Sequence, residues 1–242
     1  METKPHDNWS KFYDFVYTKS FGHAYEHFTD ETLKVIKEIL PDGSIIDYGA
    51  GTGRVAIPLN QSGYEIIAVE RSSGMASELI KKRDNLKLNF PVYNCSISEY
   101  DSKSCDLALA IFTVLSYSIT DDELFKNLEN ICKHLKPKGY LFLDLPDMVF
   151  FNLTQLPFIQ TKECRRSVRL INTNQDSIYV YKEYCSGIFN GENFEYTDEF
   201  QLKYWELTYV GNLLKQLGLI QMPGNFNQFA NGGSTYKLFQ KQ

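Results

Sequence analysis

One stretch constrains the fold more than any other: a short apolar segment that runs directly into three alternating glycines. Residues 44–48 (Ser-Ile-Ile-Asp-Tyr) have the pattern of a buried strand, Gly49, Gly51 and Gly53 that of a tight turn, and Val55 opens a helix. Glycines at such a turn let a ligand approach the backbone, and the N–H groups at the start of the helix then face that ligand. The stretch therefore predicts a binding site.

A second apolar strand, Ile66 to Val69, follows the helix and ends at Glu70. In nucleotide-binding α/β units, an acidic residue roughly 20 positions after the glycines binds a pair of ribose hydroxyls. Strand, glycine turn, helix, strand and acid together predict a site for a cofactor that contains a nucleoside.

The residues of the turn indicate which cofactor. The dinucleotide fingerprint G-x-G-x-x-G requires a third glycine where this chain has Arg54. Asp47, at the end of the first strand, would repel a pyrophosphate but would attract a ligand that carries an ammonium and a sulfonium group. An NAD-dependent oxidoreductase is therefore disfavoured.

Ile45 to Gly53 (Ile-Ile-Asp-Tyr-Gly-Ala-Gly-Thr-Gly) closely resembles motif I of the class I S-adenosylmethionine-dependent methyltransferases. The stretch after Glu70 is similar to the family's acid–hydrophobic–Ser–x–x–Met pattern, and residues 135–139 are similar to its Leu-Lys-Pro-Gly-Gly turn, with Lys138 in place of one glycine. The resemblance covers about residues 25–145 and 205–242.

Strand and helix patterns alternate over most of the chain, as in a doubly wound α/β fold. The resemblance implies a mostly parallel, seven-stranded, Rossmann-like methyltransferase sheet with an inserted antiparallel β cap. Expected segments include a helix at 29–40 capped by Thr29 or Asp30, a third strand at 90–94, a helix at 121–135 on which His134 faces solvent, and a strand at 140–145. The predicted division is a cofactor-binding domain at 1–149 plus 206–242 and an insertion at 150–205.

The insertion changes to a period of two residues, with antiparallel strands expected at 168–171, 178–185 and 194–204. Asn190-Gly191 is a strong hairpin signal. On the last strand the apolar face comprises Phe194, Tyr196, Phe200, Leu202 and Tyr204. Such insertions in similar enzymes cover the substrate entrance or form a homodimer. The aromatic face is either plain core, or Tyr179, Tyr181 or Tyr204 projects into the substrate pocket.

The N-terminal segment, Trp9 to Phe28, is dense in aromatic residues and is predicted to be helical with a break near Gly22. Two interpretations stay open: an amphipathic helix packed on the sheet, or a lid over the cofactor. Small-molecule methyltransferases have a similar Tyr-Asp-rich opening and a tyrosine like Tyr25 near the methionyl end of the cofactor.

The resemblance implies roles for the cofactor residues. Gly49 to Gly53 would lie beneath the methionyl and ribose parts with Asp47 near the ammonium, and Glu70 would bind the ribose hydroxyls. Ser96 stands where the family usually has an aspartate for the adenine amino group, so its hydroxyl or the Ile97 backbone would substitute. The full expected set is Tyr25, Asp47, Gly49, Ala50, Gly51, Arg54, Glu70, Arg71, Met75, Ser96, Ile97 and Phe112. Arg71 would stack on the adenine, and Met75 lies near the adenine or is a core residue.

Residues for the methyl acceptor are less defined. Phe112 to Tyr117 follow the fourth strand at the carboxyl end of the sheet, where open α/β sheets bind their ligands. The expected substrate pocket comprises Tyr13, Tyr17, Thr113, Tyr117, Asp144 and Tyr204. No base stands out, and the weak candidates for catalysis are Tyr17, Tyr117 and His23. The predicted reaction is methyl transfer from S-adenosylmethionine, leaving S-adenosylhomocysteine, to N or O of a small molecule without a metal.

Composition limits the partners. The net charge of −5 and the absence of a basic stripe disfavour nucleic acid, although an RNA or protein acceptor, or a non-catalytic cofactor-binding module, remains an alternative. Five cysteines occur singly, without the C-x-x-C spacing of a zinc site. No apolar run reaches the roughly 20 residues of a membrane span, and the N-terminal residues Met1 to Asp7 have no apolar signal core, so a cytoplasmic enzyme is expected.

Overall fold

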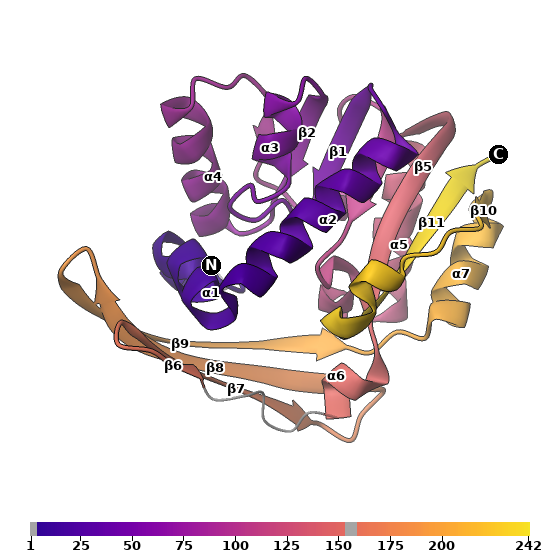
Figure 1. The fold of residues 1–242 in the computed structure, drawn as a ribbon. Coiled ribbons are helices and arrows are strands. Elements are labelled where there is room, and N and C mark those ends of the chain that lie inside the picture. The colour runs from indigo at the N-terminus through magenta and orange to yellow at the C-terminus, as the bar shows by residue number, and fades with distance from the viewer. Residues whose placement is uncertain (1–3, 153–158) are drawn as a thin grey trace.

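The apolar strands around the glycine turn form the middle of a seven-stranded sheet in the computed structural model, which describes residues 4–152 and 159–242. The strand order is β10-β11-β5-β4-β1-β2-β3, in which β10, β11 and β5 pair antiparallel and the other neighbours pair parallel (Figure 1). Its strands are β1 Ser44–Tyr48, β2 Glu65–Val69, β3 Val92–Tyr93, β4 Cys105–Ala110, β5 Leu135–Pro146, β10 Leu219–Gln221 and β11 Ser234–Lys241. The predicted mostly parallel seven-stranded sheet is confirmed.

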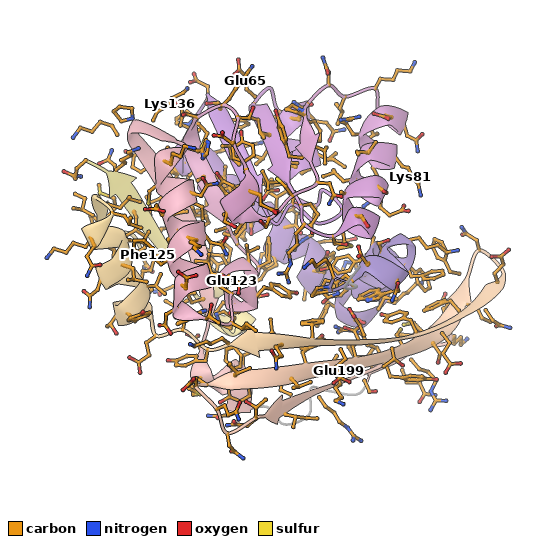
Figure 2. All side chains as sticks on the ribbon, turned by 180° about the vertical axis from the view of Figure 1, so that it is seen from behind. Glu65, Lys81, Glu123, Phe125, Lys136 and Glu199 are labelled. Atoms are coloured by element: carbon orange, nitrogen blue, oxygen red, sulfur yellow. The ribbon has the colours of Figure 1, made fainter. Side chains whose placement is uncertain are left out.

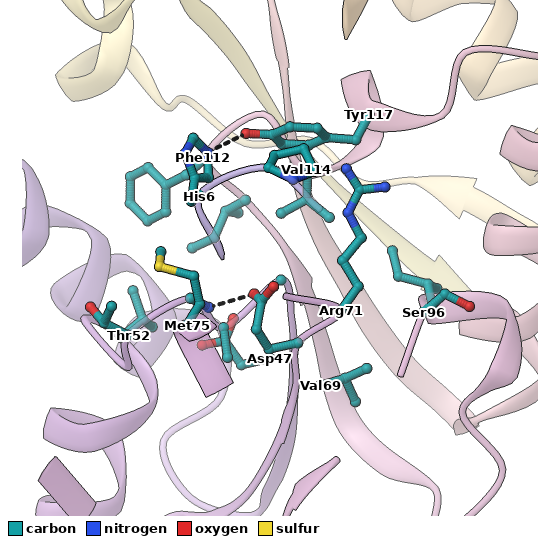
Figure 3. Close-up of a pocket in the computed structure, with 18 of the residues that line it drawn as sticks. His6, Asp47, Thr52, Val69, Arg71, Met75, Ser96, Phe112, Val114 and Tyr117 are labelled. Atoms are coloured by element: carbon teal, nitrogen blue, oxygen red, sulfur yellow. Dashed lines mark hydrogen bonds between the residues drawn. The ribbon is translucent and has the colours of Figure 1, made fainter. Parts of the chain in front are cut away.

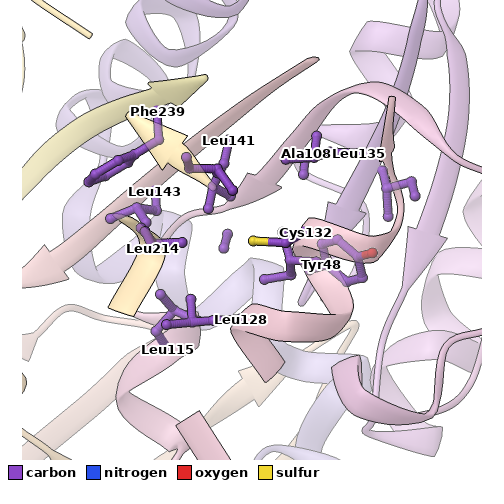
Figure 4. Close-up of a cluster of buried hydrophobic side chains, with 14 of the residues drawn as sticks. Tyr48, Ala108, Leu115, Leu128, Cys132, Leu135, Leu141, Leu143, Leu214 and Phe239 are labelled. Carbon is purple, nitrogen blue, oxygen red and sulfur yellow. The ribbon is translucent and has the colours of Figure 1, made fainter. Parts of the chain in front are cut away.

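Helices cover both faces of this sheet because its central strands are apolar on both sides. They are α1 Tyr13–Phe21, α2 His23–Ile39, α3 Ala56–Gln61, α4 Ser73–Asn85, α5 Asp121–Lys133, α6 Met148–Asn152 and α7 Leu207–Gln216, with 3₁₀ turns η1 Asp7–Phe12, η2 Ile97–Glu99, η3 Val114–Tyr117 and η4 Asn227–Gly232. One core lies between the sheet and helices α5 and α7, where Leu128, Leu141 and Leu214 are fully buried (Figure 4). A second core fills the opposite face, beneath α2 and α3.

The insertion forms a separate four-stranded antiparallel sheet in the order β6-β7-β8-β9. Its strands are β6 Ile159–Gln160, β7 Cys164–Asn172, β8 Ile178–Phe189 and β9 Glu192–Lys203. The Asn190-Gly191 hairpin is confirmed: Phe189 pairs with Glu192, and both turn residues have positive φ. Alternate residues of β9 are buried, as the period of two predicted. The division of the chain into domains stays a prediction.

This cap sheet lies across one end of the seven-stranded sheet, with η1 and α1 between the two (Figure 1). Glu65 and Lys136, near the amino ends of their strands, lie at the far end of the molecule, whereas Glu123 lies close to the cap (Figure 2). The carboxyl ends of the parallel strands therefore face the cap, and the topological switch between β1 and β4 opens toward it.

Several expected boundaries and one exposure are wrong. Helix α2 begins at His23 rather than at Thr29, because Thr29 does not cap a helix but donates its hydroxyl to the Tyr25 carbonyl within one. Strand β3 is only two residues long, and β5 begins at Leu135 because Leu135 already pairs with Cys105, ahead of an irregularity in the register of β4 and β5. His134 is 3% exposed, not solvent-facing, because its ring packs edge-on against Tyr100.

Candidate functional site

The three glycines between β1 and α3 all have positive φ, but their surroundings differ. A Cβ on Gly49 would lie 2.4 Å from Val114 Cγ2, and one on Gly53 would lie 2.3 Å from Leu79 Cδ1, so these two permit close packing. The nearest atom to a Cβ on Gly51 is Met75 Cε at 3.6 Å, since Gly51 faces a cavity. Of these three glycines, Gly51 is therefore the one with free space above its Cα atom, where a ligand could approach.

Glu70 connects the two loops at the floor of this cavity. Its Oε2 accepts a hydrogen bond from Gly51 N at 2.8 Å, and its Oε1 accepts one from Ser72 N at 2.8 Å. Burial raises the pKa of Glu70, although these two hydrogen bonds oppose the rise. Each carboxylate oxygen uses one lone pair on the loops, which leaves another for a ligand hydroxyl.

Asp47 lies at the end of β1 and is 3% exposed. Burial, together with the neighbouring Glu70, raises the pKa of Asp47 to about 7, and Arg54 acts in the opposite direction. The carboxyl groups of Asp47 and Glu70 thus share one wall of the cavity. Neither of them forms an ion pair with another described residue. A positively charged ligand would relieve their repulsion, whereas a pyrophosphate would add to it.

Arginine and aromatic side chains form the neighbouring wall. The Arg54 guanidinium lies 3.5 Å from the ring centre of Phe112 and 4.5 Å from that of Tyr25. Arg71 lies over Tyr117, 4.7 Å from its ring centre. Cation–π contacts of this kind hold planar groups in fixed positions, so the wall is pre-organised.

Residues 5–21, which include η1 and α1, lie over one side of the cavity and are called the lid here. Asp7 accepts hydrogen bonds from Ser72 Oγ at 2.6 Å and from Gly74 N at 2.9 Å, at the start of α4. Asp14 accepts a hydrogen bond from Thr52 Oγ1 and forms an ion pair with Lys82. The lid also packs against the cap, where Trp9 stacks on Tyr196 with 4.3 Å between ring centres. Both open interpretations of this segment therefore describe part of it: it is packed, and it lies over the glycine turn.

The cavity has a volume of about 240 Å³. All twelve residues expected at the cofactor line it, as do Tyr13 and Tyr117 from the expected substrate pocket. Figure 3 shows Asp47 and Met75 on one side and His6 and Tyr117 on the other. Ser96 donates its hydroxyl to Glu99 in a capping box, so this hydroxyl is already engaged within the chain.

Five other expected site residues do not line the cavity. Tyr17 lies behind Tyr13, on which it stacks at 4.3 Å. Asp144 accepts a hydrogen bond from Thr113 N and so supports the turn after β4, where Phe112 and Thr113 both have positive φ. Tyr204 packs edge-on against Phe151 in the core of the cap, and the His23 side chain is fully exposed.

The sequence did not reveal His6, which lines the cavity together with Pro5, Thr52 and Ser118. The His6 Nε2 atom lies 2.9 Å from the Tyr117 hydroxyl, and its Nδ1 lies 3.1 Å from Asp198 Oδ2 on β9. A signal for Asp198 was present: this acid falls on the inward face of β9, between Tyr196 and Phe200.

Residues 4–152 and 159–242 contain no group of three or more His, Cys, Asp or Glu side chains arranged to bind a metal ion. Within the same ranges, every helix is too short or too polar to span a bilayer.

The fold and the cavity define an α/β protein with a ligand-sized cavity at the carboxyl ends of its parallel strands, lined by the carboxyl groups of Asp47 and Glu70. Residues 45–139 match a family model described as a methyltransferase domain. A relative that carries the name of a methyltransferase, YqeM of Bacillus subtilis (strain 168), is 23% identical over 237 residues, which cover 93% of each chain.

Solved structures show the same fold. An S-adenosylmethionine-dependent methyltransferase from Clostridium acetobutylicum ATCC 824 superposes with a TM-score of 0.79 at 16% identity, over 96% of this chain and 98% of that one. The sugar N-methyltransferase KedS8 from Streptoalloteichus sp ATCC 53650 superposes with a TM-score of 0.73 at 13% identity, over 100% of this chain and 94% of that one.

Residues 45–139 thus match a methyltransferase domain, and the chain shares the fold of an S-adenosylmethionine-dependent methyltransferase over almost its whole length. A methyltransferase domain of this kind implies S-adenosylmethionine as the cosubstrate, and the two carboxyl groups beside the glycine turn fit its positive charges. The same likeness disfavours an NAD-dependent oxidoreductase.

Proposed function

We propose that this enzyme transfers the methyl group of S-adenosylmethionine to a nitrogen or oxygen atom of a small-molecule acceptor. The observation that carries the proposal is the cover over part of the cavity: besides the glycine turn, it is lined by His6 and Tyr13 of the lid and by Tyr117. A segment of RNA or protein would need an open groove at this place. A small molecule fits beneath the lid.

Charge and likeness to known enzymes support the same class of acceptor. The chain has a net charge of −5, and nucleic-acid-binding proteins usually carry a basic surface. KedS8, which shares the fold across almost its whole length, is named as a sugar N-methyltransferase. A sugar or another small molecule with an amine or hydroxyl group is therefore the first acceptor to test.

The cosubstrate would be held by the twelve residues of the expected cofactor set, all of which line the cavity. Asp47 would face its ammonium group, and Glu70 would accept hydrogen bonds from the ribose hydroxyls. When bound, S-adenosylmethionine supplies an activated methyl group on a positively charged sulfur. The chain itself contributes position and exclusion of water, which together account for a large part of the acceleration of a displacement reaction.

Transfer of radiolabelled methyl from S-adenosylmethionine tests the proposal. The purified chain is incubated with amino sugars, simple sugars, phenols and small amines, and in parallel with total RNA and with unfolded protein. Label in a small molecule, formed together with S-adenosylhomocysteine, is the expected result. Label that appears only in RNA or protein would contradict it.

The outer face of the cap bears on the predicted homodimer. Ile171, Tyr184 and Ile188 are exposed there, at 45%, 41% and 49%. A homodimer through the cap would cover these side chains and stays a prediction. Size-exclusion chromatography of the chain and of an Ile188→Lys variant distinguishes a dimer that depends on this face from a monomer.

A further inference from the structure

Three polar side chains from distant parts of the chain meet where the lid and the cap adjoin the cavity. His6 comes from the lid, Tyr117 from η3 and Asp198 from β9 of the cap. The Tyr117 hydroxyl is 2.9 Å from His6 Nε2, and Asp198 Oδ2 is 3.1 Å from His6 Nδ1. The row therefore runs from a carboxylate through an imidazole to a hydroxyl that lines the cavity.

Asp198 fixes the orientation of the imidazole. Its Oδ2 accepts a hydrogen bond from the His6 backbone N at 2.9 Å and another from Trp9 Nε1 at 2.9 Å. Burial would raise the pKa of Asp198, but these contacts with His6 and Trp9 hold it below its ordinary value, so the carboxylate is ionised. A carboxylate beside Nδ1 favours the proton on that nitrogen, although the approach is not aligned for an ideal hydrogen bond.

With the proton on Nδ1, Nε2 presents a lone pair to the Tyr117 hydroxyl. Both side chains are held on other sides as well: the His6 ring packs edge-on against Trp9 and Phe200, and Arg71 lies over Tyr117. The His6 backbone has a φ of 69°, a left-handed conformation that costs free energy in a residue other than glycine. The fold therefore holds the His6 imidazole against the cavity at a cost in backbone conformational free energy.

We propose that His6 and Tyr117 form the proton-accepting pair of the methyl transfer and that Asp198 is the residue that positions them. This proposal rests on the proposed function and narrows the acceptor to a group that loses a proton in the reaction, a hydroxyl or an amine.

In the proposed step the acceptor atom forms a bond to the methyl carbon, and the carbon–sulfur bond breaks with its electron pair on sulfur. The proton on the acceptor atom moves to Tyr117 Oη while the Tyr117 proton moves to His6 Nε2. The resulting imidazolium lies beside the Asp198 carboxylate, which stabilises its charge, and it later loses the proton to water.

The first test measures the imidazole itself and needs no acceptor. Nitrogen-15 NMR of the full chain, with S-adenosylhomocysteine bound and the His6 signals assigned by His6→Gln, shows which nitrogen carries the proton. We expect the proton on Nδ1 in the native chain, a changed Nε2 signal in Tyr117→Phe, and loss of the Nδ1 preference in Asp198→Asn. A proton on Nε2 that does not respond to Tyr117→Phe overturns the pair.

The second test uses an acceptor from the panel above. His6→Gln should lower kcat by about 100- to 10,000-fold, the usual contribution of a general base, and should leave the S-adenosylhomocysteine affinity within about threefold. His27→Gln, at an exposed position on α2, is the matched control and should leave kcat unchanged. A His6→Gln enzyme that retains the native kcat refutes the proposal while the proposed function stands. Absence of methyl transfer to every small molecule refutes the proposed function instead.

Discussion

Asp47 offers the sharpest test of the electrostatic reasoning, because the same buried charge should weaken the free protein and strengthen its complex. Burial and Glu70 raise the pKa of Asp47 from 3.8 to about 7. The folded state therefore keeps a proton that the unfolded state has lost between about pH 4 and pH 7, so this group makes the protein less stable as the pH rises through that window.

The size of the effect follows from the difference in pKa. One pKa unit corresponds to about 1.4 kcal/mol, so the ionised carboxylate costs about 4 kcal/mol in the free protein above its folded pKa. Asp47→Asn removes this cost, but its buried amide needs partners, which takes back about 1–3 kcal/mol. We expect the free energy of unfolding to rise by about 1–3 kcal/mol near pH 8 and not to rise near pH 4.

Urea unfolding of both proteins over about pH 4 to 8 measures this difference, and titration calorimetry with S-adenosylhomocysteine measures the cost to binding. Loss of one partner of a buried charged hydrogen bond should weaken binding by about 2–3 kcal/mol, or roughly 30- to 150-fold. Because the pKa values of Glu70 and Asp144 are also raised by burial, the variant should keep a shallower dependence on pH rather than none. An Asp47→Asn protein with native pH dependence and native affinity would refute the electrostatic argument.

Three other variants test separate parts of the structure. Glu70→Ala should weaken S-adenosylhomocysteine binding by about 1–3 kcal/mol in calorimetry, because ribose hydroxyls and the Gly51 N–H lose their acceptor, and an unchanged affinity would place the ribose elsewhere. Asp7→Ala removes the three hydrogen bonds that Asp7 accepts from Ser72, Ser73 and Gly74 at the start of α4, so we expect faster dissociation of S-adenosylhomocysteine in stopped-flow fluorescence. An unchanged rate would show that the lid does not limit release. Leu128→Ala empties a fully buried position beneath α5 and should lower the free energy of unfolding by about 2–5 kcal/mol while the affinity for S-adenosylhomocysteine is retained. A loss in urea unfolding below about 1 kcal/mol would contradict the packing shown for that helix.

The seven-stranded sheet was predictable because each of its central strands has a local signal: a continuous apolar run next to a glycine, an acid or a helix cap. The helices between the strands have local signals as well: Thr120 was predicted to cap α5, and its side chain accepts a hydrogen bond from Glu123 N at the start of that helix. The expected cofactor residues meet in one cavity for the same reason, since they follow the carboxyl ends of neighbouring parallel strands.

Other features depend on contacts that have no local signal. Asp144 ends a buried strand, as a site residue would, yet the carboxylate supports the turn at Thr113 rather than facing the cavity. His134 is buried because Tyr100 covers it, and nothing in the periodicity of α5 indicates that contact. His6 lies before the first regular helix and meets an acid 192 positions later in the chain.

The position of His6 beside Asp7 in the chain connects two functions of the lid. Asp7 can bind Ser72 and Gly74 only while the lid lies on α4, and the His6 ring reaches Tyr117 and Asp198 in that same position. Closure of the lid, which excludes water from the cavity, therefore also assembles the proposed proton acceptor. A lid displaced from α4 would expose the glycine turn and separate His6 from Tyr117, so the base would be complete only when the cavity is closed. Asp7→Ala should accordingly lower methyl transfer as well as accelerate release, although Asp7 itself does not line the cavity.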